Sequence, residues 1–147
     1  MKLILQRVNS ASVEVNKKII GKINKGITIF LGISKDYNEK KLDWMINKIL
    51  KLKLWGDETS PNFKKNIEQI KGEILIISQF TLHGTVTSGT KPNFNNSMPG
   101  NQAKEIYKLF IKKLGEKTNL KIQTGKFGEY MKITQENDGP ITIILKK

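Results

Sequence analysis

The spacing of apolar residues changes along the chain, and it predicts where strands and helices lie. Short apolar or alternating runs at Lys2–Val8, Val13–Val15 and Ile19–Ile23 indicate strands. Two further runs, Ile27–Ile33 and Glu73–Ser78, are almost continuously apolar and rich in β-branched residues. Such runs are typical of strands that are buried on both faces of a sheet.

Two segments have the helical period. One extends from Asn38 to about Lys51, and the other begins near Asn101. The predicted buried stripe of the first helix is Leu42, Met45, Ile46, Ile49 and Leu50. The predicted buried face of the second helix is Ala103, Ile106, Tyr107, Phe110 and Leu114. Between the two helices, Gly56–Pro61 has the composition of a loop.

The C-terminal part of the chain returns to strands, predicted at Leu120–Thr124, Tyr130–Thr134 and Ile141–Leu145. Gln135–Pro140 is expected to be a turn between the last two. Gly84–Gly100 is a long loop, and loops of this length in a compact domain are commonly functional or mobile. The pattern predicts a single α+β domain over residues 1–147. We expect a curved, mainly antiparallel, barrel-like sheet flanked by two helices.

The composition removes several classes of chemistry. The chain has 147 residues, no cysteine and one histidine, His83. These counts exclude a disulfide scaffold, a cysteine nucleophile and a multi-histidine metal centre, so we expect no metal and no cofactor. No apolar run approaches the roughly 18 residues of a membrane helix. Met1–Val8 has the pattern of a strand rather than a targeting peptide, so we expect a cytoplasmic protein without membrane contact.

The formal net charge of +13 leaves two explanations open. A surface that binds a polyanion needs such an excess of cations. However, Arg7 is the only arginine among 26 basic residues, and the lysines are spread along the whole chain, which a general compositional bias also explains. If a nucleic acid is bound, lysines favour contact with phosphates rather than with base edges.

The first candidate site is Ser78-Gln79-Phe80-Thr81, at the end of a predicted buried strand. Its hydroxyls could bind a substrate, or Thr81 could attack an ester or amide. A hydroxyl nucleophile needs a base, and His83 is the only candidate nearby. The alternative is that Ser78 and Thr81 satisfy backbone groups at the strand end.

Asn137-Asp138-Gly139-Pro140 is the second candidate, and its local sequence favours an ordinary turn. A glycine beside a residue with a fixed φ angle can also direct backbone carbonyls outward, where they could bind a substrate ammonium group.

The third candidate is Thr124–Met131. Gly128 permits close approach of the backbone, and Phe127, Tyr130 and Met131 could form the wall of an apolar slot for an adenine or an aromatic group. The alternative for these side chains is core packing. None of the glycines forms a nucleotide-triphosphate or dinucleotide fingerprint.

Several motifs occur together in a fixed order. They are Gln6-Arg7-Val8 with Ala11-Ser12-Val13, Gly26, Ser78–Leu82, Lys91–Phe94, Thr124–Gly128 with Met131, and Asn137–Thr142. This series closely resembles the D-aminoacyl-tRNA deacylases, also called D-tyrosyl-tRNA(Tyr) deacylases, over essentially the whole chain. The resemblance implies hydrolysis of the ester between a D-amino acid and the 3′-terminal adenosine of tRNA, with glycyl-tRNA as a further substrate. By the same resemblance, this hydrolysis serves as chiral proofreading in translation quality control.

The resemblance also implies an architecture for the site. The family forms homodimers with a cross-subunit active site, in which a cis Gly139-Pro140 peptide reaches the partner's Ser78–Thr81 segment. Main-chain carbonyls would hold the α-ammonium group, and main-chain N–H groups at Phe80 and Thr81 would stabilise the oxyanion. A water assisted by the 2′-hydroxyl then fits better than a Thr81 nucleophile.

By the same resemblance, Phe127 and Tyr130 shape the adenosine end of the pocket, and Arg7 holds the Gly-Pro loop. His83 stands where the family more often has Tyr or Phe, so it need not take part in catalysis. Gly84–Lys91 carries one cation where relatives often carry several. Two alternatives are a non-catalytic basic RNA-binding module and a hydrolase of another ester that depends on Thr81.

Overall fold

The computed structural model describes residues 1–87 and 89–147, apart from the side chain of Asn62. Ser88, within the predicted loop Gly84–Gly100, lies outside the described residues. The strands are β1 (Lys2–Val15), β2 (Lys18–Ile23), β3 (Gly26–Gly32), β4 (Lys53–Asp57), β5 (Ser60–Asn66), β6 (Glu73–Ser78), β7 (Ile122–Thr124) and β8 (Lys132–Lys146). The helices are α1 (Glu39–Lys51), the short 3₁₀ helix η1 (Phe80–His83) and α2 (Gly100–Lys117).

The main sheet is mixed: it has the predicted antiparallel pairs and, in addition, parallel pairs that the sequence pattern did not predict. Strand β1 pairs antiparallel with β2, β3 and β8, but β3–β6 and β6–β7 are parallel pairs. The reason is the position of the helices. The chain passes through α1 between β3 and β6, and through α2 between β6 and β7, and a helical crossover returns the chain in the same direction.

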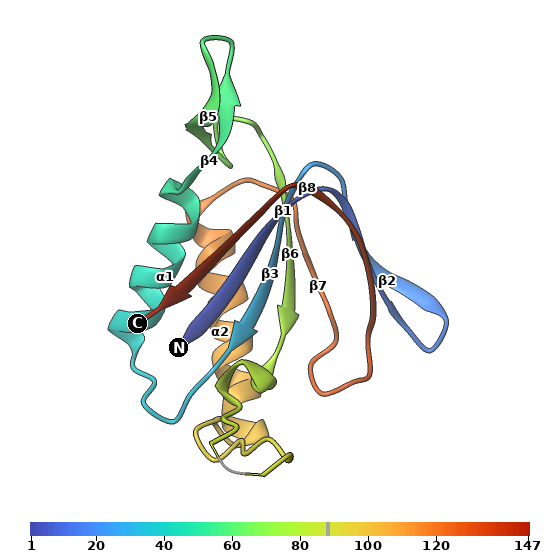
Figure 1. Cartoon of the computed structure of the whole chain (residues 1–147), viewed down its shortest axis with the longest axis vertical. Helices are drawn as coiled ribbons and strands as arrows, with labels where there is room; N and C mark the ends of the chain where they lie inside the picture. Colours follow the sequence, from blue (N-terminus) through green and yellow to red (C-terminus); the bar gives the residue numbers. More distant parts are fainter. Residues whose placement is uncertain (88) are drawn as a thin grey trace.

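The sheet curls into a nearly closed barrel around β1. The first half of β1 pairs with β3 and its second half with β2, while β8 follows β1 along almost its whole length. Strand β2 also contacts β6 and β7 across the barrel. Figure 1 shows α1 and α2 side by side along one face of this curved sheet.

Strand β8 is continuous, where the sequence predicted two strands separated by a turn. In its pairing with β1, Thr142 lies opposite Gln6 and Asn137 opposite Val8. The residues 138–141 therefore bulge out of the ladder opposite the single residue Arg7. The turn chemistry of the Asp-Gly-Pro sequence was recognised correctly, but it produces a bulge within one strand, and such irregular bulges often occur next to functional sites.

Two apolar clusters stabilise the fold on the two faces of the sheet. The larger lies beneath the helices and contains all five residues of the predicted α1 stripe, together with Ala103, Tyr107, Phe110 and Leu114 of α2. The smaller fills the curl of the sheet. Strand β6 supplies Ile74 and Ile76 to the first cluster and Leu75 and Ile77 to the second, so it is buried on both faces as predicted.

One hairpin was missed by the sequence pattern. The predicted loop Gly56–Pro61 is the turn region of the antiparallel pair β4–β5, which forms a separate two-stranded sheet. The Asp57 carboxylate accepts hydrogen bonds from the N–H groups of Thr59 (2.9 Å) and Ser60 (3.0 Å), which fixes this turn.

Candidate functional site

A cavity of about 470 Å³ lies where the ends of β3 and β6 meet η1, the start of α2 and the segment that connects β7 to β8. We call it the main cavity. Seven of the eleven predicted site residues line it: Ser78, Gln79, Phe80, Phe127, Gly128, Tyr130 and Met131. The structure therefore brings together the first and third candidate segments, which are about fifty residues apart in the sequence.

The floor of the main cavity is formed where β6 ends and the chain turns into η1. The Gln79 N–H donates to the Leu31 carbonyl oxygen (2.8 Å), continuing the β3–β6 pairing to the edge of the sheet. The next two N–H groups, of Phe80 and Thr81, open the 3₁₀ helix and have no acceptor among the described residues. Unpaired N–H groups are expected in the first turn of a helix. They are available to an incoming oxygen atom.

Thr81, the next residue, has an exposed side chain and is not among the residues that line the main cavity; its hydroxyl oxygen accepts a short hydrogen bond from the Gln79 side-chain amide. Within the described part of the chain, no carboxylate or imidazole is hydrogen-bonded to this hydroxyl. A threonine without a base is a weak nucleophile. The geometry therefore offers main-chain donors at this position rather than an activated side chain.

The opposite wall of the main cavity contains side chains that pack in the core and one that is exposed to solvent. The Phe127 ring packs against Tyr107 (centroids 5.6 Å apart), whose buried hydroxyl donates to the Ile76 carbonyl oxygen (2.8 Å). Met131 packs against the smaller core cluster. Tyr130 is 91% exposed, so core packing does not explain it. Gly128 has a φ angle of 81°, which favours glycine at this turn.

The main cavity offers little acid or base chemistry from side chains. Of its lining residues among those described, Glu129 is the one with an ionisable carboxylate, and it forms an ion pair with Lys126 (3.2 Å). No group of three or more His, Asp or Glu residues that could hold a metal ion occurs in the described residues.

His83 does not face the main cavity. It lies at the end of η1 and lines a second cavity. Burial lowers the pKa of its imidazole, and the Met1 ammonium and Lys2 lower it further, while a backbone hydrogen bond with Gly32 opposes them. A base for Thr81 is therefore not supplied by His83 in this arrangement.

The remaining predicted residues form a separate group at the bulge of β8. The Gly139–Pro140 peptide bond is cis, as the family resemblance implied. Arg7 Nε donates to the Asp138 carbonyl oxygen (3.2 Å) and pairs with its carboxylate (3.0 Å), while another guanidinium nitrogen donates to the Leu54 carbonyl oxygen (2.5 Å). Arg7 thus joins β1, β4 and the bulge.

This bulge is remote from the main cavity within one chain. Neither Gly139 nor Pro140 is among the residues that line the cavity. Figure 1 shows the bend of β8 at one end of the sheet, whereas η1 and the loop that follows it lie near the other end. The second candidate segment is therefore not united with the other two in a single subunit.

Sequence reasoning missed Ser97 and Met98, which line the main cavity. The Ser97 hydroxyl donates to the Phe80 carbonyl oxygen (3.0 Å), and the Phe94 ring meets the Phe80 ring edge-on at 5.1 Å. The length of the loop Gly84–Gly100 indicated that this segment could be functional, but nothing in the sequence pointed to these two residues. In the described part of the chain, no helix is long and apolar enough to cross a membrane.

Comparison with known proteins gives consistent matches over the full length. The family model described as D-Tyr-tRNA(Tyr) deacylase matches residues 4–146. A D-aminoacyl-tRNA deacylase of Thermosipho melanesiensis is 44% identical over 145 residues, covering 99% of this chain and 96% of that protein. One of Clostridium botulinum is 43% identical over 145 residues, with the same coverage.

Two solved structures have the same fold. One, described as a c-Myc DNA Unwinding Element Binding Protein, has a TM-score of 0.95 and 41% identity, covering 100% of this chain and 99% of that chain. Another, described as a probable eukaryotic D-amino acid tRNA deacylase, has a TM-score of 0.80 at 16% identity, covering 98% and 97%. At that identity the second match supports the fold alone.

Proposed function

Because the chain belongs to the D-Tyr-tRNA(Tyr) deacylase family, we propose that its main cavity receives the 3′-terminal adenosine of a D-aminoacyl-tRNA. The protein is a D-aminoacyl-tRNA deacylase, an ester hydrolase. The cavity has a suitable size, since small-molecule sites typically measure about 300–1,000 Å³. The rings of Phe127 and Tyr130 provide apolar surface for the adenine.

The observation that carries the mechanism is the pair of main-chain N–H groups at the start of η1, which have no acceptor in the described part of the chain and lie next to a Thr81 hydroxyl that has no base there. In the proposed reaction, a water molecule attacks the ester carbonyl carbon. The N–H groups of Phe80 and Thr81 stabilise the oxyanion, each contributing about 2.7–4 kcal/mol. The adenosine 2′-hydroxyl assists the proton transfer, the bond to the 3′ oxygen breaks, and the D-amino acid and tRNA are released.

Main-chain groups would distinguish D-aminoacyl from L-aminoacyl substrates. Carbonyl groups near Gly139 and Pro140 hold the α-ammonium group, and the walls around Cα collide with an L side chain. Because main-chain contacts are the same for every substrate, the pocket does not discriminate between different D side chains. Glycyl-tRNA has no Cβ to exclude and is also hydrolysed. The protein would then act in cytoplasmic translation quality control.

Such a pocket requires two subunits, since Gly139 and Pro140 lie away from the main cavity of their own chain. We propose a homodimer in which each bulge enters the partner's site. Ile144 on β8 is 64% exposed, which leaves apolar surface for such an interface. The lysines would provide a diffuse attraction for the tRNA backbone.

The cross-subunit arrangement is tested by mixing two inactive variants. Phe80→Ala removes the ring that packs against Phe94 and so displaces the start of η1, where the two N–H groups lie. Gly139→Val places a branched side chain where φ is 127° and a Cβ would lie 3.0 Å from the Ile141 N atom. After denaturation and refolding together, mixed dimers contain one intact composite site and regain part of the D-Tyr-tRNA deacylation. Activity that stays at the level of the separate variants contradicts the shared site.

The alternative function, a non-catalytic RNA-binding module, is separated by one comparison. Purified protein is incubated with D-Tyr-tRNA, and both bound RNA and released D-tyrosine are measured. Release that is proportional to protein concentration supports the deacylase. Salt-dependent RNA binding without release supports the module instead.

A further inference from the structure

A second cavity, of about 430 Å³, lies at the far end of η1 from the main cavity. We call it the His83 cavity. The side chains used below are Lys2, Lys35, His83, Thr85, Asn96 and Lys146, which all line it. They come from β1, the segment after β3, η1, the loop that follows it, and β8. Nothing in the proposed reaction uses this cavity.

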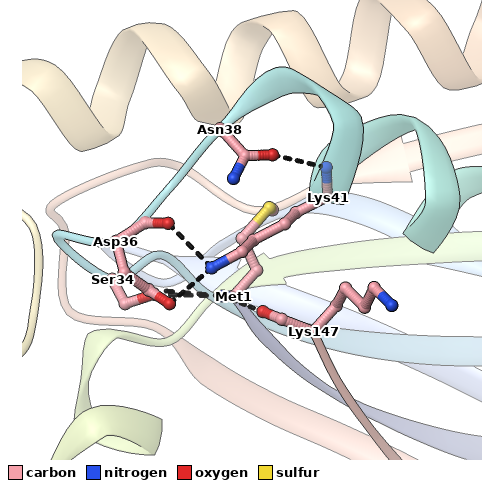
Figure 2. Close-up of polar contacts among 6 residues, drawn as sticks. All are labelled: Met1, Ser34, Asp36, Asn38, Lys41 and Lys147. Atoms are coloured by element: carbon pink, nitrogen blue, oxygen red, sulfur yellow. Dashed lines mark hydrogen bonds and ion pairs between the residues drawn. The ribbon is translucent and has the colours of Figure 1, made fainter.

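Asp36 is the one aspartate or glutamate among the described residues that line this cavity, and its carboxylate already has cationic and hydroxyl partners. The Lys41 ammonium donates to it (2.6 Å), and the Ser34 hydroxyl makes a short hydrogen bond to it. Figure 2 shows Asp36 and Ser34 drawn together with the Met1 ammonium, which donates to Ser34 Oγ (3.0 Å) and to the Lys147 carbonyl oxygen (2.9 Å). These partners hold the pKa of Asp36 well below its usual range. Its charge is therefore not available to balance other cations.

Lys2, Lys35 and Lys146 form no ion pair with an aspartate or glutamate side chain among the described residues. Lys2 Nζ donates to the Leu82 carbonyl oxygen (2.7 Å), which leaves two of its three protons free. In the part of the chain described, neither Lys35 nor Lys146 forms an ion pair with a carboxylate. Lys147 is different, because its Nζ lies over the Trp44 ring at 5.3 Å and is engaged there.

His83 adds an unsatisfied polar atom to this cationic surface. Its Nε2 is buried and has no hydrogen-bond partner among the described residues. Buried polar atoms are nearly always paired, and a polar ligand in the cavity would give this nitrogen a partner. The cavity therefore combines free ammonium groups, an orphan ring nitrogen and the side-chain donors of Thr85 and Asn96.

We propose that the His83 cavity binds a phosphate group, held by Lys2, Lys35 and Lys146 and contacted by His83. Lysine binds phosphate as a point charge, and several converging donors suit its oxygens. The phosphate is either a backbone phosphate of an RNA or free inorganic phosphate. Both have the same oxygen chemistry, and the two arms of the test separate them.

The first arm measures binding without catalysis, so it is independent of the proposed deacylase function. His83 is the single histidine of the chain, and its ring C–H signals in a proton NMR spectrum are unambiguous. Inorganic phosphate is titrated at constant ionic strength, with chloride as the reference anion. We expect a saturable shift of the His83 signals and an increase in its pKa, because a bound anion favours the imidazolium form.

The matched variants carry the same loss of charge at different places. Lys35→Gln with Lys146→Gln weakens phosphate binding by about fivefold per lysine, from the upper range for exposed charge pairs. Lys18→Gln with Lys22→Gln on β2, two exposed lysines outside the cavity, leaves binding unchanged. No saturable shift, or a shift of the same affinity in the cavity double variant, overturns the proposal. Thermal melting confirms that each variant is folded.

The second arm identifies the source of the phosphate. If it belongs to RNA, the cavity double variant raises KM for D-Tyr-tRNA without lowering kcat, and inorganic phosphate competes with tRNA. If the ligand is free phosphate, the first arm still gives saturable binding, while the KM of the cavity double variant equals that of the β2 double variant.

Discussion

Arg7 connects the β8 bulge to the rest of the fold, and its replacement is the most informative perturbation. Its side chain is 13% exposed, and that of its partner Asp138 is 30% exposed. Arg7→Met keeps the length and apolar stem but removes the three contacts to Asp138 and Leu54. Hydrogen bonds to charged groups contribute about 1.5–3 kcal/mol each. Because this pair is partly solvated, we expect a total loss of about 2–4 kcal/mol.

Arg7→Lys keeps the charge but cannot reach both partners in the same geometry, so we expect about half of that loss. Unfolding in urea measures the free energy of each variant. If the bulge forms part of the site, a displacement of about 1 Å lowers kcat on D-Tyr-tRNA by about 10²-fold under conditions where the variant is fully folded.

Lys22→Met is the matched control, because it removes an exposed lysine from β2 and should change neither quantity. The reasoning is refuted if Arg7→Met unfolds within about 0.5 kcal/mol of the unmodified protein, the usual range for surface substitutions. A large loss of stability with kcat unchanged would show that Arg7 has a structural role only and that the bulge is not part of the active site.

Three further predictions concern η1. Thr81→Ala keeps activity within about tenfold, because alanine retains the main-chain N–H group that stabilises the oxyanion. Loss of a true nucleophile would instead cost about 10⁴-fold or more, so complete loss of activity in a folded, tRNA-binding variant would favour covalent catalysis. Gly32→Ala would place a Cβ 2.9 Å from Leu82 Cβ, so we expect about 1–3 kcal/mol of destabilisation and a lower kcat as η1 is displaced; a crystal structure with η1 unmoved would contradict this. Burial lowers the pKa of His83 below 6.5, so the unfolded state binds more protons than the folded state just below that pH, and stability falls as the pH decreases through this range. His83→Phe removes this dependence. An identical pH profile of the two proteins in urea unfolding would show that the imidazole is not responsible.

The helices and buried strands were predictable because their burial is a local property of the sequence. The α1 stripe at Leu42, Met45, Ile46, Ile49 and Leu50 is buried residue by residue. Strand β6 likewise has the predicted burial on both faces. In both cases the apolar period directly reflects which neighbours cover the element.

The sheet order and the β8 bulge were not predictable in the same way. Whether Gly139–Pro140 forms a turn or a bulge depends on its pairing with β1, about 130 residues away in the sequence, and on Arg7. The local sequence of Asn137–Pro140 favours an ordinary turn and carries no information on its pairing partner. Parallel pairing of β3 with β6 follows from the helical crossover, which is visible only when the elements are considered together.

The main cavity was predicted in part, because motifs identified Ser78–Phe80 and Phe127–Met131 but not their contact. That contact depends on β7 pairing with β6, which carries the following segment to the edge where η1 begins. Ser97 was missed because its role depends on a hydrogen bond to the Phe80 carbonyl, which leaves no trace in local sequence.

The most direct test of the account compares two substrates that differ only in chirality. D-Tyr-tRNA and L-Tyr-tRNA are prepared on the same tRNA, and the first-order rate of deacylation is measured for each with purified protein. We expect rapid release of D-tyrosine from D-Tyr-tRNA and hydrolysis of L-Tyr-tRNA at the rate of the enzyme-free control. Equal rates on the two substrates, or no acceleration on either, would contradict it.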